Sequence, residues 1–174
     1  DYRETLDKSS SEIVLLWPTK SEKPYYAAFG WLGAGVKVPT ANTLWKTRGS
    51  RLSPDTPLLM TWDNGEGLIF ERHYSLDENY MITLTQRVKN NTSKDVSLAP
   101  YGLISRTGTP DILGFYILHE GLIGVLGEEQ LVLKEVDYSD LRDDGPQKES
   151  TTGGWLGITD KYWLAALIPD QKTK

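Results

Sequence analysis

Hydrophobic and polar residues alternate most regularly between positions 80 and 89 of this chain. Within that segment, the even positions 80, 82, 84 and 88 hold the apolar residues Tyr80, Ile82, Leu84 and Val88, and position 86 holds Gln. A period of two places one side of a strand against a core and the other side in water. The segment is therefore predicted to be a half-buried strand with these four side chains facing the core.

Two apolar runs precede this strand, at 58–62 and 68–74, and the sequence Asp63-Asn64-Gly65-Glu66-Gly67 lies between them. Asn-Gly between two apolar runs is a strong hairpin signal, because these residues tolerate the positive φ angles of tight turns. A further strand is expected at 96–105. The pattern therefore predicts consecutive antiparallel strands in the middle of the chain.

Weaker signals occur elsewhere. Short apolar runs that predict strands, the first of them ended by Pro18, lie at 12–17, 25–32, 115–118, 122–126 and 131–138. The Pro-, Thr- and Ser-containing stretch 36–57 is expected to be a long surface excursion, pinned by one buried aromatic residue in the pair Leu44-Trp45. One helical turn is expected near 140–142. No segment has a sustained helical period, so long helices are not expected.

The stretch 151–171 is the densest in aromatic and apolar residues. Its two apolar runs, 155–158 and 162–168, are separated by Thr159-Asp160-Lys161, which suits a turn. Runs of this length, bounded by Gly-Gly and by Pro-Asp, fit strands that are buried on both faces. We predict a pair of strands here and expect this stretch to organise the core.

Composition supports one folded, all-β domain. A chain of 174 residues is long enough for one ordinary domain with a core and short for two. With 39% hydrophobic and 25% charged residues it is globular rather than disordered. Its 16 Gly and nine Pro are spread along the chain, which favours many strands and turns over long helices.

Charge and cysteine content exclude several function classes. The net charge is -5 and the basic residues are scattered, so the chain lacks the basic footprint that a nucleic-acid partner requires. The absence of Cys excludes disulfides, thiolate catalysis and Cys-ligated metals. The longest apolar run has seven residues, far below the ~20 of a membrane span, and no signal-peptide pattern is present at the start.

Candidate catalytic residues are few. His119 and Glu120 could act as general acid and base, but neighbouring residues of a strand point to opposite faces, so a turn role is favoured. His73, the other histidine, falls in a predicted strand, where a surface or cross-strand role is favoured over a ligand role. No catalytic residue is assigned.

Candidate ligand sites are equally sparse. Two isolated histidines cannot supply a zinc site, and Asp63-Asn64-Gly65-Glu66 lacks the spacing of a calcium loop, so Asn-Gly in a hairpin explains it better. No phosphate-binding, dinucleotide-binding or nucleophile-elbow motif is present, and no cofactor is expected. The six Trp could line a groove, although most lie inside apolar runs and are expected in the core.

Three sequence phrases identify a family. WDNGEGLIFERHYSLDENYMITLTQRVKNNTSKDVSLAPYGLISRTGTP, FYILHEGLIGVLGE and GGWLGITDKYWLAALIPDQ resemble, in the same order, the large periplasmic domain of YidC, the bacterial inner-membrane protein insertase, most closely in alphaproteobacterial versions. The resemblance is strong over 58–171 and weaker over 1–45. The phrase Gly-Gly-Trp-Leu-Gly-Ile-Thr-Asp-Lys-Tyr-Trp is its most specific part.

The resemblance implies a fold and a location. The family has a β-supersandwich of two large antiparallel sheets, similar to galactose mutarotases, which agrees with the strand pattern. Residues 1–174 are expected to be a single periplasmic domain, or a fragment with missing edge strands, of a protein anchored in the inner membrane. Trp155, Tyr162 and Trp163 are then expected to be core anchors, with Trp163→Ala costing about 3–5 kcal/mol.

Three functional hypotheses follow. The first is a non-catalytic interaction surface, with Sec accessory proteins (SecDF) implied as partners by the resemblance and substrate segments as a further hypothesis. The second is a carbohydrate-binding or mutarotase-like enzyme on the same fold, which would need His119, Glu120 and His73 to form a cleft. The third is a spacer that sets the geometry of a membrane part. Sharing a fold does not carry an activity over, and no partner-binding residues are assigned.

Overall fold

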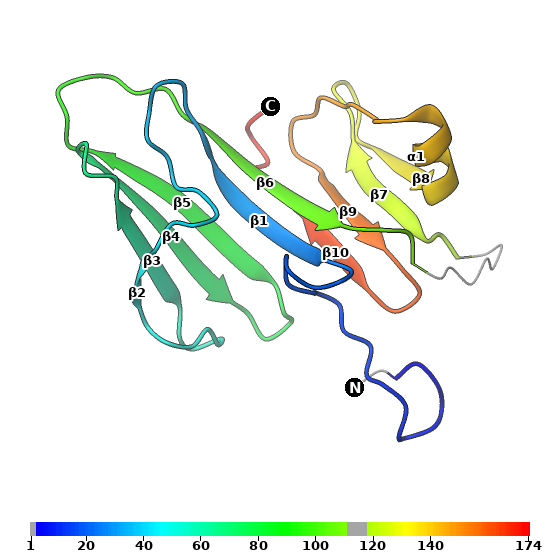
Figure 1. Ribbon diagram of the computed structural model, residues 1–174. Helices are drawn as coiled ribbons and strands as arrows, with labels where there is room; N and C mark the ends of the chain where they lie inside the picture. Colours follow the sequence, from blue (N-terminus) through cyan, green and yellow to red (C-terminus); the bar gives the residue numbers. More distant parts are fainter. Residues whose placement is uncertain (1–2, 111–117) are drawn as a thin grey trace. The chain divides into compact units, whose positions relative to one another are not determined.

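A computed structural model describes residues 3–110 and 118–174 of the chain. These residues form ten strands and one short helix, which confirms the all-β prediction (Figure 1). In chain order the elements are β1 (Tyr25–Leu32), β2 (Lys46–Arg48), β3 (Leu58–Asp63), β4 (Leu68–Leu76), β5 (Ile82–Asn90), β6 (Ala99–Arg106), β7 (Gly121–Leu126), β8 (Val132–Asp137), α1 (Tyr138–Asp144), β9 (Trp155–Thr159) and β10 (Leu164–Leu167). No helix in these two ranges is long and apolar enough to span a bilayer.

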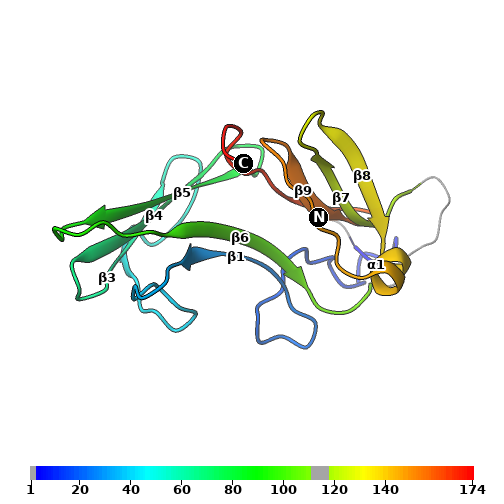
Figure 2. The ribbon, with the colours of Figure 1, turned by 90° about the horizontal axis from the view of Figure 1, so that it is seen from above.

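The chain divides into two compact units. The first unit combines Asp1–Ala28 with Gly102–Lys174, and the second is Phe29–Tyr101. Strands β1 and β6 pair with each other, as Figure 2 shows, and each strand contributes residues to both units. Beyond the strand ends, Thr107 N donates a hydrogen bond to Pro24 O at 2.9 Å.

The second unit contains the four-stranded antiparallel sheet β2-β3-β4-β5. The predicted hairpin is confirmed: β3 and β4 pair with Trp62 opposite Phe70, and β4 pairs with β5 so that Val88 also lies opposite Phe70. The prediction that Tyr80 and Ile82 face the core is wrong, because both are exposed. β5 begins only at Ile82, and the buried cluster lies further along the sheet, around Phe70.

The buried hydrophobic cluster also belongs to the second unit, whereas the buried Tyr25 belongs to the first. Trp31, Leu68 and Phe70 form one buried cluster, with the rings of Trp31 and Phe70 edge to face at a centroid distance of 5.1 Å. Trp62 lies 5.6 Å from Phe70. Aromatic pairs prefer such tilted or edge-on arrangements, which add to the stabilisation from burial. The core is therefore built around an aromatic cluster from β1, β3 and β4.

The first unit contains the antiparallel sheet β10-β9-β7-β8. The predicted strand pair of the C-terminal stretch is confirmed, with Leu167 opposite Leu156 and Leu164 opposite Thr159. The prediction that these strands are buried on both faces is wrong, because Leu156 and Leu164 are exposed. β9 has a paired strand on each side, yet Leu156 is exposed, so strand pairing alone does not cover the faces of these strands.

The expected aromatic anchors of the C-terminal stretch are less buried than predicted. Tyr162 is exposed, with the Lys161 ammonium 4.9 Å from its ring centroid. Trp155 and Trp163 are half-buried. Trp17, also expected in the core, is exposed. The stretch therefore does not organise the core, which lies around Phe70 in the other unit.

Other expectations are corrected in detail. The segment 12–17 is not a strand. It forms only two isolated bridges, one from Glu12 to Arg3 and one from Trp17 to Tyr25. The stretch 36–57 is not entirely an excursion, since it contains β2. Residues 131–138 give one strand, β8, and the expected helical turn is the longer α1. The run predicted at 115–118 lies mostly outside the described residues.

The position of the core predicts which aromatic residue contributes most to stability. Phe70→Ala should lower the free energy of unfolding by about 3–5 kcal/mol, because it leaves a cavity in the buried cluster. Trp163→Ala should cost less, because Trp163 is only half-buried. Urea denaturation of both variants measures the difference. An equal or larger loss for Trp163→Ala would place the core in the C-terminal stretch after all.

Candidate functional site

Asn64 organises the loop between β3 and β4. Its side chain is buried, with 1% of its surface exposed, and its Oδ1 accepts hydrogen bonds from Glu66 N at 2.8 Å and Leu68 N at 3.0 Å. Its Nδ2 donates to Lys37 O at 3.1 Å. The positive φ angles predicted for Asn-Gly occur at Gly65 and Gly67, not at Asn64. Asn64 thus acts through its side chain, which joins this loop to the one after β1.

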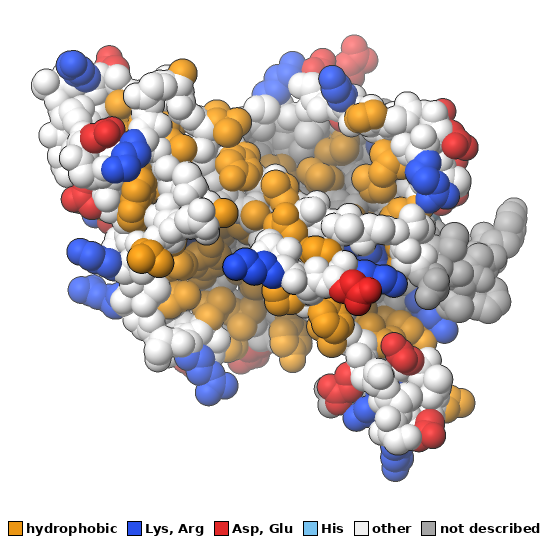
Figure 3. All heavy atoms as spheres, viewed as in Figure 1, with side chains coloured by type: hydrophobic (Ala, Val, Ile, Leu, Met, Phe, Trp, Pro, Cys, Tyr) orange, Lys and Arg blue, Asp and Glu red, His pale blue; other side chains and the backbone are white. Residues whose placement is uncertain are grey.

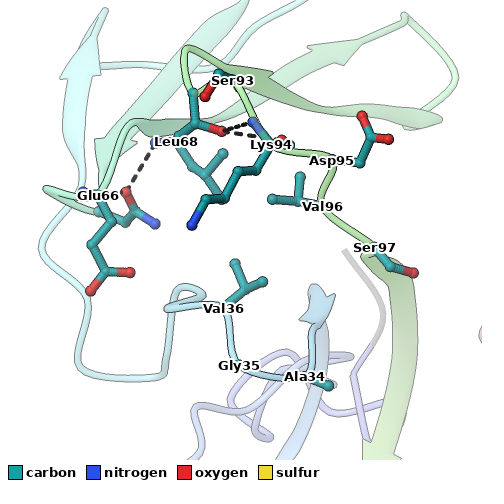
Figure 4. A pocket seen from close by; sticks show the side chains of 12 residues that line it. Ala34, Gly35, Val36, Glu66, Leu68, Ser93, Lys94, Asp95, Val96 and Ser97 are labelled. Atoms are coloured by element: carbon teal, nitrogen blue, oxygen red, sulfur yellow. Dashed lines mark hydrogen bonds between the residues drawn. The ribbon is translucent and has the colours of Figure 1, made fainter.

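A surface pocket of about 500 Å³ lies beside this loop. Its lining comes from the connections after β1, β3 and β5 of the second unit and from the first residue of β4: Ala34, Gly35, Val36, Asn64, Glu66, Leu68, Thr92, Ser93, Lys94, Asp95, Val96 and Ser97. Figure 4 shows the side chains of Val36, Val96 and Lys94 directed into the pocket, whereas the Asp95 carboxylate points away. The lining thus mixes apolar side chains with polar ones and with charges of both signs.

A polar cluster in the first unit joins β6, α1 and the turn between β9 and β10. The guanidinium of Arg106 donates to Asp160 at 2.5 Å and to the Tyr138 hydroxyl at 3.2 Å, and Tyr138 donates to Asp160 at 3.3 Å. The Arg106 guanidinium also lies 4.8 Å from the ring centroid of Tyr25. The charged side chains of Arg106 and Asp160 are mostly buried, so water stabilises them little. Each charge is therefore stabilised mainly by the other.

This environment shifts two tyrosine pKa values. Burial, followed by the nearby negative charge of Asp160, raises the pKa of Tyr138 to about 12, against the opposing effect of Arg106. Burial also raises the pKa of Tyr25. Both hydroxyls are therefore neutral at physiological pH and act as hydrogen-bond or ring partners. The cluster links β6, α1 and the β9–β10 turn within the first unit.

His119 has a structural role. Its Nε2 lies 2.9 Å from Leu122 O, and its Nδ1 lies 3.2 Å from Asp137 Oδ1. Asp137 is the N-cap residue of α1, yet it makes no side-chain capping hydrogen bond. Its carboxylate is turned toward His119 instead. The imidazole thus pairs with Asp137, and sequence reasoning, which considered Glu120, missed this partner.

The remaining candidate residues do not form a site. His73 is exposed on β4, opposite Leu59 and Thr85, and belongs to the second unit, whereas His119 belongs to the first. Asp63 accepts a hydrogen bond from Gly65 N at 2.8 Å as part of the hairpin loop. Across residues 3–110 and 118–174, no group of three His, Cys, Asp or Glu side chains is placed to hold a metal ion.

These features define an all-β domain whose polar clusters fix loops and helix ends. Comparison with known proteins then specifies the family. The sequence matches the YidC periplasmic domain family over residues 1–174. It is 49% identical over 179 residues to the membrane protein insertase YidC of Methylorubrum extorquens, covering 98% of this chain, and 46% identical over 184 residues to that of Ruegeria sp., covering 97%.

The chain belongs to the YidC periplasmic domain family. The resemblance predicted from three sequence phrases is thereby confirmed, as are its alphaproteobacterial character and the periplasmic location. The chain spans 29% of the length of the Methylorubrum relative and 30% of that of the Ruegeria relative. The activity of the whole insertase therefore does not transfer to these residues by similarity alone.

Asn64→Ala should destabilise the second unit. The substitution removes three hydrogen bonds and leaves the amides of Glu66 and Leu68 without their acceptor, so we expect a loss of about 3 kcal/mol in the free energy of unfolding. Asp63→Ala, which removes one hydrogen bond at an exposed position, is the matched control and should cost under about 1 kcal/mol. Equal losses, measured by urea denaturation, would contradict the role of Asn64.

Tyr138 should make stability fall at high pH. Its pKa is about 12 in the folded chain against a reference value of 10.0, so the folded state retains this proton at a pH where the unfolded state has lost it. The corresponding stability is fully present below pH ~10 and is lost as pH rises toward ~12. Tyr138→Phe should flatten this part of the pH profile. An unchanged profile, or a tyrosine absorbance titration complete near pH ~10, would contradict the assignment.

Proposed function

We propose that this chain is a non-catalytic interaction domain of an inner-membrane insertase. In this proposal, residues 1–174 act as one periplasmic domain that contacts Sec accessory proteins (SecDF) and segments of emerging membrane-protein substrates. The observation that carries it is the match to the YidC periplasmic domain family over the whole chain, with relatives named membrane protein insertase. The Sec partner is what the family resemblance implies.

The surface of the chain is consistent with protein contacts. On the face drawn in Figure 3, hydrophobic side chains are exposed between acidic and basic ones. Such mixed surfaces are typical of interfaces that form and dissociate, where a few apolar or aromatic residues dominate binding. The net charge of -5 would favour a partner with a basic surface and would make association weaken as salt is raised.

The enzyme alternative has no supporting observation in the described residues. A mutarotase-like site needs a histidine and a carboxylate facing a sugar-sized cleft. His119 is occupied by Asp137 and Leu122 O, and His73 is exposed on a strand of the other unit. The lining of the described pocket contains no histidine. An interaction role therefore accounts better for the geometry.

Binding to the periplasmic parts of SecDF tests the proposal. The full-length insertase in detergent should bind them with an affinity that decreases between low and physiological salt, and removal of residues 1–174 should abolish this binding. Isothermal titration or interferometry measures both. Absence of binding at high micromolar concentration would overturn the SecDF assignment. Normal insertion in cells that carry the deletion would favour a spacer role instead.

A further inference from the structure

The connection between β4 and β5 is a tightly hydrogen-bonded turn. The carboxylate of Asp77 accepts hydrogen bonds from Asn79 N at 2.8 Å and Met81 N at 2.9 Å. The backbone of Asp77 also donates to Met81 O and accepts from Tyr80 N. Side chains of Asp often fix turns in this way. The turn thus has a defined conformation, and the residues at its end are held in place.

Tyr80 is an unusual residue for its position in this turn. Its φ angle is +64°, and it is the only non-glycine residue with a positive φ in the described parts of the chain. This region suits Gly and Asn, and a bulky residue there is a genuine outlier. The backbone alone would therefore favour a smaller residue at position 80.

The fold does not use the Tyr80 side chain either. It is 88% exposed, and within residues 3–110 and 118–174 it makes no hydrogen bond or ring contact. A residue that suits neither the backbone nor the packing of its own chain points to a contact outside that chain. Met81 and Ile82, which follow it, are 51% and 56% exposed. Three consecutive apolar residues are thus exposed where the turn leads into β5, and they are called the tip below.

The charged residues next to this tip in the sequence are acidic. Between Tyr74 and Arg87 the sequence contains Asp77 and Glu78 and no Lys, Arg or His. An acidic tip is repelled by an anionic lipid surface, which attracts basic segments instead. It is attracted to an apolar pocket of a protein that carries Lys or Arg at its rim. Tyr is among the residues most enriched at the energetic centres of protein interfaces.

We propose that the tip formed by Tyr80, Met81 and Ile82 is a protein-docking element, which inserts into an apolar pocket rimmed by basic residues on a partner protein. The side chain of Tyr80 is the central contact, and the acidic residues Asp77 and Glu78 lie toward the basic rim. This inference rests on the proposed function, because it names the surface through which the domain engages a partner.

Tyr80→Gly separates docking from folding. Glycine accepts a positive φ without strain, so the variant should be as stable as the parent chain or more stable. Its affinity for the periplasmic parts of SecDF should nevertheless fall at least about tenfold, the effect expected of a central aromatic contact. Leu44→Gly is the matched control, since Leu44 is 90% exposed in the same unit. Unchanged binding by Tyr80→Gly, with binding by the parent intact, would overturn the docking role and leave the proposed function standing.

Thiol labelling decides the proposal even if SecDF does not bind. The chain has no cysteine, so Tyr80→Cys and Leu44→Cys each introduce one thiol into the full-length insertase, freed of any other cysteines. In native membranes, maleimide should modify position 80 at least about tenfold more slowly than position 44, and the difference should disappear when the insertase is purified alone in detergent. Equal rates in native membranes would overturn the proposal. Protection of position 80 in vesicles that contain only the purified insertase would overturn it in favour of contact with lipid or with the insertase itself.

Discussion

The second unit is organised around one partly buried cation, the guanidinium of Arg72. It lies 4.5 Å from the ring centroid of Trp45 and 5.3 Å from that of Trp31, and the two rings are stacked with their centroids 6.5 Å apart. It also donates a hydrogen bond to Phe29 O. Removing a cation from water is costly, and two aromatic faces and one acceptor offset part of that cost here, although Nε has no hydrogen-bond partner among the described residues. Here one side chain of β4 fixes both β1 and the segment that leads into β2.

The arrangement also explains how β1 is held against the sheet of the second unit. β1 pairs with β6 and not with a strand of the sheet β2-β3-β4-β5, so no ladder joins it to β4 or β5. Side chains make the connection instead: Arg72 reaches Phe29 O, and Gln86 donates to Gly30 O at 3.1 Å. These contacts favour one position of β1, although Arg72 Nε and Gln86 Oε1 are buried without a hydrogen-bond partner among the described residues. The aromatic cluster around Phe70 then packs in a fixed arrangement.

The first unit is stabilised differently, by close backbone packing. A Cβ atom at Gly124 would lie 2.8 Å from Trp155 O, and no side chain fits there without a shift of the backbone. Gly157 is similarly enclosed by the backbone of Ala165. These glycines let β7, β9 and β10 approach closely although no large apolar residue of these strands is fully buried. Within the stretch that was expected to organise the core, Gly157 is therefore required for the close approach of β9 and β10.

Periodicity predicted the strands better than it predicted their burial. The hairpin of β3 and β4 and the strand pair β9 and β10 follow from local turn chemistry, which can be read from the residues of the turns. Burial depends on which elements pack against a strand, and the alternation of residue types does not contain this information. The alternation therefore predicted burial for Tyr80, which is exposed. The candidate sites were harder still: Arg72, Arg106 and Asp137 acquire roles only from partners far away in sequence. Tyr80 is informative for the same reason, since its alternating position predicted burial and only its φ angle and exposure indicate an external partner.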